Sequence, residues 1–208
     1  ETKVAQEILM KKTMLFAAAA LAASLAGCQN MGMMDDGMST TASASANSTV
    51  MVGGAAMYPT RNIIQNAVNS NEHTTLVAAV KAAGLVDTLS GPGPFTVFAP
   101  TNAAFDALPA GTVDNLLMPS NKAKLQKVLT YHVVPGRITA ADIAAKIRAG
   151  GGTATYTTVE GEPLTFRMNG NEIVATGVGG GTATVTQPDV MQSNGVIHVV
   201  NGVVLPRM

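Results

Sequence analysis

The apolar side chains of this chain change their spacing once, near Gly152, and that change limits the folds open to it. Before it, from about residue 61, apolar residues recur three or four positions apart, which is typical of amphipathic helices. After it, they alternate in short runs, which is typical of half-buried strands. Helices that come first and strands that dominate the end predict an α+β fold, with a mostly antiparallel sheet or sandwich covered by helices.

Cap residues and chain breakers set the expected boundaries. Helices are expected over 61–69 and 74–83, after the caps Thr101, Thr112 and Ser120, and from the capping box of Thr139 and Asp142 to Gly150. Strands are expected over 95–99, 131–134, 153–158, 164–168, 172–175, 182–186, 196–200 and 203–205. Asn169-Gly170 falls between two of these strands and predicts a hairpin.

Cys28 is the only cysteine of the 208 residues, so no disulfide can form within the chain and a packed core must stabilise the fold. Trp is absent, and only five Phe and three Tyr are present, so aliphatic side chains must fill that core. Basic and acidic residues balance, at 13 each, and no basic patch indicates a nucleic-acid surface.

The first 28 residues have the order of a secretory signal. Lys11 and Lys12 precede an apolar run over 15–23, which is too short to span a membrane. Met10 is the expected start of this signal, and residues 1–9 do not fit it. The ending Leu25-Ala26-Gly27-Cys28 resembles the lipobox of bacterial lipoproteins. That resemblance implies cleavage after residue 27, lipidation of Cys28, and a cell-envelope protein held at the outer membrane or cell surface.

Residues 28–56 are expected to form a lipidated, flexible tether rich in Met, Ser, Thr and Ala, because small polar residues bury too little apolar surface to become ordered. The tether also carries a cluster of methionines. Since thioethers are ligands that suit Cu(I), this cluster is a candidate copper site, and an ordinary low-complexity linker is the alternative. The candidate ligands are Met31, Met33, Met34 and Met38.

Three segments resemble the fasciclin (FAS1, beta-Ig-H3) domain family. They are residues 95–105, 129–136 and 193–206, and they occur in the order and at the spacing of that family. The resemblance covers the segment from Tyr58 to Pro206, and a domain over 57–206 is expected. It implies a wedge-shaped β-sandwich, mostly antiparallel, with several helices packed on it and N-terminal helices. It also implies an extracellular adhesion or interaction module of a bacterial lipoprotein.

In animal relatives, adhesion is associated with a Tyr-His motif and with an Asp-Ile segment before the last strand. Tyr131-His132 matches the first motif. Pro188-Asp189-Val190-Met191 resembles the second, with Val190 where Ile is usual and Gln187 where an acid is common. The resemblance therefore implies that these six residues bind a partner.

The same residues also have structural interpretations. Tyr131 and His132, alternating on a strand, would be buried rings with bonded polar atoms. Asp189 would accept hydrogen bonds from the backbone of a turn. His198, on an apolar strand, is expected to lie in the core, and His73 is expected to be exposed.

The chain has no Gly-x-Ser-x-Gly elbow, and its glycine runs at 150–152 and 179–181 precede strand-like segments instead of helix N-termini. We therefore expect a binding protein, not an enzyme, without a cofactor. Adhesion to a protein or glycan is the first hypothesis. Copper handling or a stress role through the Met-rich tether, and binding of a small apolar ligand in a gap of the sandwich, are the alternatives.

Overall fold

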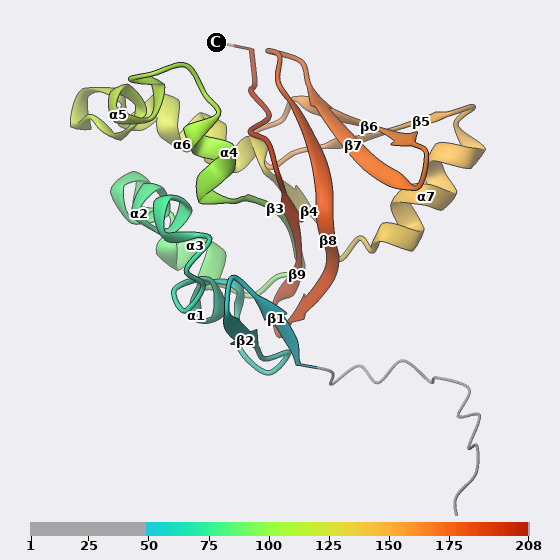
Figure 1. The fold of residues 1–208 in the computed structure, drawn as a ribbon, viewed down its shortest axis with the longest axis horizontal. Helices are drawn as coiled ribbons and strands as arrows, with labels where there is room; N and C mark the ends of the chain where they lie inside the picture. The colour runs from blue at the N-terminus through green and yellow to red at the C-terminus, as the bar shows by residue number, and fades with distance from the viewer. Residues whose placement is uncertain (1–48, 208) are drawn as a thin grey trace, which may run out of the picture. The chain divides into compact units, whose positions relative to one another are not determined.

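The computed structural model describes residues 49–207, which form a two-stranded hairpin, a seven-stranded sheet and the helices packed on it (Figure 1). The strands are β1 (Val50–Val52), β2 (Ala55–Met57), β3 (Phe95–Pro100), β4 (Val133–Pro135), β5 (Thr153–Thr157), β6 (Pro163–Asn169), β7 (Glu172–Gly177), β8 (Thr182–Gln192) and β9 (Gly195–Val200). The helices are α1 (Ile63–Ala67), α2 (Thr74–Ala83), α3 (Val86–Ser90), α4 (Asn102–Asp106), α5 (Thr112–Leu117), α6 (Lys122–Tyr131) and α7 (Ala140–Ala149). The α+β prediction is confirmed.

The strand order in the large sheet is β4-β3-β9-β8-β7-β6-β5. Strands β3 and β9 pair in parallel, and the other neighbours in this sheet pair antiparallel. The long strand β8 joins the two halves of the sheet, because it pairs with β7 through residues 182–184 and with β9 through residues 185–192. The two outer strands approach each other, since the N–H of Val159, just after β5, donates to the carbonyl of Val133 in β4 at 2.7 Å.

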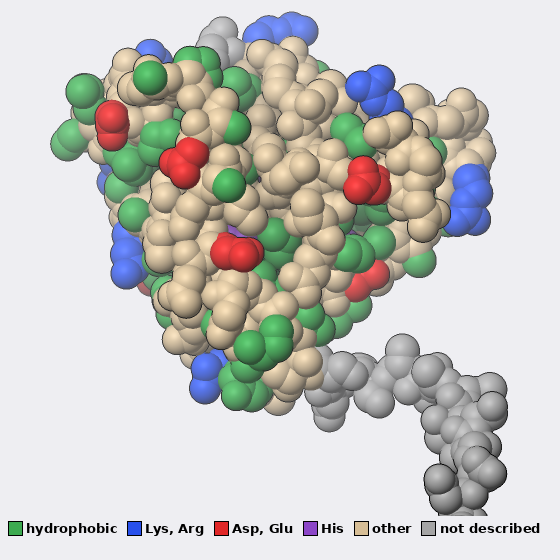
Figure 2. All heavy atoms as spheres, in the orientation of Figure 1, with side chains coloured by type: hydrophobic (Ala, Val, Ile, Leu, Met, Phe, Trp, Pro, Cys, Tyr) green, Lys and Arg blue, Asp and Glu red, His purple; other side chains and the backbone are tan. Residues whose placement is uncertain are grey.

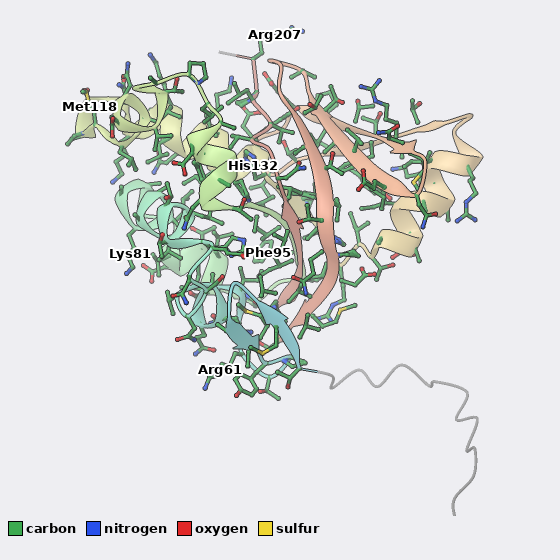
Figure 3. All side chains as sticks on the ribbon, in the orientation of Figure 1. Arg61, Lys81, Phe95, Met118, His132 and Arg207 are labelled. Atoms are coloured by element: carbon green, nitrogen blue, oxygen red, sulfur yellow. The ribbon has the colours of Figure 1, made fainter. Side chains whose placement is uncertain are left out.

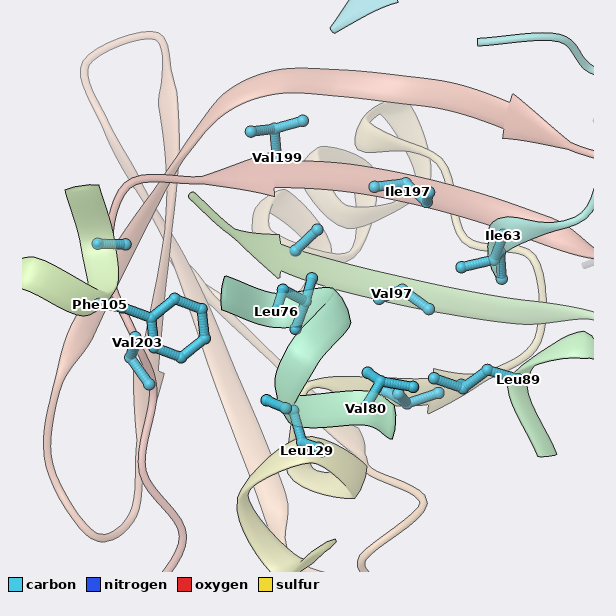
Figure 4. Packing of buried hydrophobic residues seen from close by; sticks show 14 of the residues in the cluster. Ile63, Leu76, Val80, Leu89, Val97, Phe105, Leu129, Ile197, Val199 and Val203 are labelled. Atoms are coloured by element: carbon cyan, nitrogen blue, oxygen red, sulfur yellow. The ribbon is translucent and has the colours of Figure 1, made fainter. Parts of the chain in front are cut away.

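The apolar side chains of residues 49–207 gather in two clusters, one on each side of β3 and β9. Helices α1 to α6 lie on one side of these strands, and α7 with β5 to β7 lies on the other (Figure 1). In β3, Val97 and Ala99 belong to the first cluster, whereas Phe98 belongs to the second. Figure 4 shows side chains of the first cluster, where Leu76 and Val80 of α2 pack over Val97. Burial on both faces explains why β3 and β9 read as continuous apolar runs.

Local sequence signals explain several boundaries. Thr139 and Asp142 make the predicted capping box at the start of α7, and Thr101 caps α4 by accepting a bond from the N–H of Ala104. The Asn169-Gly170 hairpin also forms, between β6 and β7. The closing strand predicted over 203–205 is wrong, because within the described chain only an isolated bridge from Leu205 to Gly180 remains there.

The flexible tether predicted through residue 56 is wrong over its last part. Val50–Val52 and Ala55–Met57 pair as the hairpin β1–β2, with Gly53 and Gly54 at positive φ in the turn. The side chains of Val52 and Met57 are buried against the first cluster. Burial of these apolar side chains therefore orders a segment that has no clear period of its own.

Candidate interaction surface

Tyr131, one of the predicted contact residues, is the last residue of α6 and is fully buried. Its hydroxyl donates to the carbonyl of Pro163 at 2.7 Å and accepts from the N–H of Val178 at 3.0 Å. Burial raises the pKa of this phenol above its usual value. The side chain thus ties α6 to the β5–β7 half of the sheet.

His132 follows Tyr131 as the C-cap of α6 and is 3% exposed. Figure 3 shows His132 inside the fold, beside α4 and the central strands. Its Nδ1 lies 2.8 Å from the carbonyl of Val128, to which it donates, and its Nε2 accepts from the N–H of Val204 at 3.2 Å. Burial lowers the pKa of His132 to about 4, so the ring is neutral at pH 7.

The predicted strand over 131–134 is therefore wrong at its first two residues, because α6 includes Tyr131 and ends with His132 as its C-cap. A helical stripe reaches into this segment, formed by Leu125, Val128, Leu129 and His132. The aromatic and β-branched residues over 131–134 favour a strand instead, and that pattern led to the wrong prediction. Tyr131 and His132 turn polar atoms to backbone partners inside the fold. In this conformation neither offers a contact surface.

The second predicted contact segment, Pro188–Met191, lies in β8 beside register shifts in its pairing with β9. Pro188 is exposed, Asp189 and Met191 are half-buried, and Val190 is 1% exposed. Asp189 has a φ of 57°, a left-handed conformation that Asp tolerates better than most residues. Its Oδ1 accepts from the N–H of Ala140 at 2.8 Å, which satisfies a free donor at the start of α7.

His198 in β9 lies beside this segment and is fully buried, as predicted for a core histidine. Its Nδ1 accepts from the N–H of Asp189 at 3.3 Å, and its Nε2 donates to the carbonyl of Ile138 at 2.9 Å. The ring stacks on Phe98 at 5.3 Å between centroids. Burial lowers the pKa of His198, and the two bonds fix the neutral ring between β8 and α7.

His73, predicted to be exposed, is 3% exposed. Its Nδ1 lies 2.8 Å from the hydroxyl of Ser70, and burial lowers its pKa. Val52 and Met57 of the hairpin line the same apolar recess as His73. The exposure prediction failed because the hairpin that covers this ring was not predicted.

The structure does not bring the two predicted motifs together. Within residues 49–207, no hydrogen bond connects Tyr131 or His132 to the segment 188–191. Cys28 and the candidate copper ligands Met31, Met33, Met34 and Met38 lie outside the described residues. Inside residues 49–207, no group of three His, Cys, Asp or Glu side chains is placed to hold a metal ion.

Sequence reasoning missed an open polar groove of about 500 Å³ at the end of the sheet where β8 turns into β9. It is lined by Asn62, Gln65, Ser90, Gly91, Pro92, Gly93, Pro94, Arg137, Ser193 and Asn194. The groove was not visible in the sequence because its residues come from four segments that only the folded chain brings together.

The apolar recesses of the described chain are much smaller than this groove. The largest of those under α1 and α2 holds about 40 Å³, enough for water-sized molecules only. Small-molecule sites usually measure about 300–1,000 Å³. Among residues 49–207, the apolar recesses under α1 and α2 are therefore too small for such a ligand.

None of the helices within residues 49–207 is long and apolar enough to cross a membrane. Their surfaces carry scattered charged and apolar side chains on the face that Figure 2 shows.

Comparison with known proteins identifies relatives of this chain. The Fasciclin domain family model matches residues 71–206. The chain is 48% identical over 175 residues to Protein sll1483 of Synechocystis, covering 83% of this chain and 90% of that protein. It is 34% identical over 200 residues to Immunogenic protein MPB70 of Mycobacterium bovis, covering 92% and 93%.

A solved FAS1 domain pair from the insect cell adhesion molecule Fasciclin I shares the fold, with a TM-score of 0.61 at 18% identity, over 71% of this chain and 52% of that one. Since the family model covers well over half of the chain and the structure has the same fold, this chain belongs to the fasciclin domain family.

Proposed function

We propose that this protein is an exported interaction module that adheres to a protein or glycan partner outside the cytoplasm while a lipid on Cys28 holds it at a membrane. The observation that carries the proposal is the contrast between its recesses. The polar groove is open and about 500 Å³, whereas the apolar recess under α1 and α2 holds about 40 Å³. Because the groove is open, it would leave much of a small ligand exposed, so it suits contact with a macromolecule better than enclosure of a small molecule. The insect relative of the same fold is named a cell adhesion molecule.

Within this proposal, the segment Pro188–Met191 contributes through its exposed part. Pro188 faces solvent, and Met191 is half-exposed. Val190 is buried within this segment, whereas Tyr131 and His132 are buried at the end of α6 and bind backbone groups there. A direct partner contact is therefore proposed only for the exposed side chains of this segment, and a structural role for the buried residues.

Binding of the full chain to intact cells and to matrix proteins, measured as a saturation curve, tests the proposed function. We expect saturable binding that unlabelled chain displaces. Replacing Pro188 by Glu, which adds a charge to an exposed position, should weaken binding if the β8 segment contacts the partner. Non-saturable binding to every surface would reject the adhesion role.

Copper handling is the second candidate, and the cluster of four methionines between residues 31 and 38 favours it. Titration of Cu(I) into the full chain and into a variant with Leu at all four positions separates it from adhesion. Tight binding by the natural chain alone would favour the metal role. Equal, negligible binding by both chains would exclude it.

A further inference from the structure

We propose that the polar groove beside Arg137 is a binding site for an acidic peptide segment, with Arg137 pairing with a carboxylate of that segment. This inference rests on the proposed function, because it names the surface and the partner chemistry of the interaction module. It differs from the roles that the family resemblance implies, because none of the six residues expected to bind a partner lines this groove.

Arg137 is the charged residue of the groove and is held in place from one side. Its Nη2 donates to the carbonyls of Gln192 at 3.2 Å and of Ser193 at 3.5 Å, both at the β8–β9 turn. Among residues 49–207, no acceptor is recorded for its Nη1 and Nε, and no carboxylate lies within 4.0 Å of it. The side chain is exposed, so three N–H donors face solvent in a fixed orientation.

The floor of the groove is held in place because the side chain of Asn194 binds two of the segments that line it. Its Oδ1 accepts from the N–H of Ile63 at 3.0 Å, and its Nδ2 donates to the carbonyls of Leu89 at 2.8 Å and Gly91 at 3.0 Å. Its own carbonyl accepts from the N–H of Phe95 at 3.0 Å. A Cβ on Gly93 would collide with that carbonyl, so the loop approaches the turn closely only as glycine.

The lining fits a peptide that carries a carboxylate. None of the ten described lining residues is acidic, and one is cationic, so the groove favours a negative group. Guanidinium and carboxylate form charge-assisted, often bidentate hydrogen bonds. The amide oxygens of Asn62 and Gln65 accept the two capping-box bonds of α1, so their amide N–H groups are the donors left for a peptide backbone. None of the lining residues is aromatic, so a sugar ring would find no aromatic face to stack on.

The test uses the isotope-labelled full chain and NMR titration with an octapeptide of alternating Glu and Ser. A peptide with Gln in place of Glu is the matched neutral probe, and an oligosaccharide containing glucuronate is the matched acidic glycan. We expect the acidic peptide to shift the Arg137 Nε–H signal and the Gln65 amide signals in a saturable way. The neutral peptide should bind at least about tenfold more weakly, since a hydrogen bond to a charged group contributes roughly 1.5–3 kcal/mol.

Two variants separate this site from a general charge effect. Gln65→Glu adds a carboxylate to the groove, and Glu is a favoured residue at this capping-box position, so α1 should keep its start. We expect it to weaken acidic-peptide binding at least about tenfold, as should Arg137→Ala. Arg148→Ala, which removes an exposed arginine of α7, is the control and should leave binding unchanged.

Unsaturable shifts, equal binding by Gln65→Glu and the natural chain, or tighter binding of the acidic glycan would each overturn the inference. The proposed function can hold even if this inference fails. If Arg137→Ala and Gln65→Glu still bind cells saturably and the peptide does not bind, the interaction module stands and this groove is not its site.

Discussion

Three histidines of this fold are buried and form hydrogen bonds to groups inside it. His73, His132 and His198 are each nearly inaccessible, and burial lowers the pKa of each. A buried neutral histidine must gain a proton when the chain unfolds below the pKa of the unfolded state. The histidines therefore make stability depend on pH.

The sign of that dependence follows from the direction of the shifts. The pKa of His132 is about 4 in the folded chain and 6.5 when unfolded, so its contribution is complete above pH 6.5 and is lost as the pH falls towards 4. We expect the free energy of unfolding to be lower at pH 4.5 than at pH 7.5, by about 2–3 kcal/mol from this ring alone. Urea unfolding at both pH values measures the difference.

His132→Gln is the control for this prediction. The variant should be less stable at pH 7.5, because the N–H of Val204 loses its partner, but its stability should fall less between pH 7.5 and 4.5. An unchanged pH dependence in the variant would show that His132 does not carry the effect.

Asp189 gives a second test at this scale, because its carboxylate binds the start of α7. Asp189→Asn keeps an acceptor for the N–H of Ala140 and tolerates the positive φ, so it should retain stability within about 0.5 kcal/mol. Asp189→Ala loses the bond and should destabilise the fold by about 1–3 kcal/mol. Denaturation curves of both variants measure this.

Asp189→Gly separates the hydrogen bond from the backbone conformation, since glycine adopts the positive φ freely and loses only the bond to Ala140. Asp189→Asn removes the charge but keeps the acceptor. If partner binding is lost in Asp189→Ala but kept in Asp189→Asn, the loss of binding has a structural cause. Full stability in Asp189→Ala would contradict the capping role.

At the scale of elements, Asn194 joins α1, α3, β3 and the β8–β9 turn through one side chain and its carbonyl. We expect Asn194→Asp to destabilise the chain by about 2 kcal/mol or more, although the shapes match. The substitution would set a carboxylate oxygen against the carbonyls of Leu89 and Gly91, both acceptors.

Thermal unfolding of Asn194→Asp beside Asn201→Asp measures this effect. Asn201 also accepts a backbone bond through its Oδ1, from Thr184, but no described carbonyl accepts from its amide nitrogen. The Asn201 variant should therefore be less affected. Equal effects at both positions would contradict the role given to Asn194.

The elements that sequence predicted well are those whose signals are local. The capping box of Thr139 and Asp142 and the Asn169-Gly170 hairpin act within a few residues, and both form as expected. The signals that failed depend on distant contacts. The hairpin over Val50–Met57 is ordered by apolar contacts with the core, and its absence from the prediction left His73 wrongly exposed.

The candidate site was less predictable than the fold for the same reason. Three of the six residues that the resemblance indicates are buried, namely Tyr131, His132 and Val190. The groove instead combines residues from distant parts of the chain, among them Gln65, Pro92, Arg137 and Asn194. A single sequence contains no local signal for such a combination.

At the scale of the whole molecule, the proposed function joins the described domain to a segment that resembles a lipidation signal. In this proposal the domain would supply an open surface, and lipid on Cys28 would keep many copies on one membrane. Several weak contacts made together can hold far better than one, because each later contact forms at a high effective concentration.

Attachment of cells that display this protein tests that claim most directly. Cells carrying the natural chain, cells carrying Cys28→Ser, and cells lacking the protein would be compared for adhesion to partner cells or matrix under flow. The account predicts strong attachment by the first alone, with added soluble chain reducing it. Equal attachment by all three, with the natural chain verified at the surface, would contradict the claim that this is an anchored interaction module.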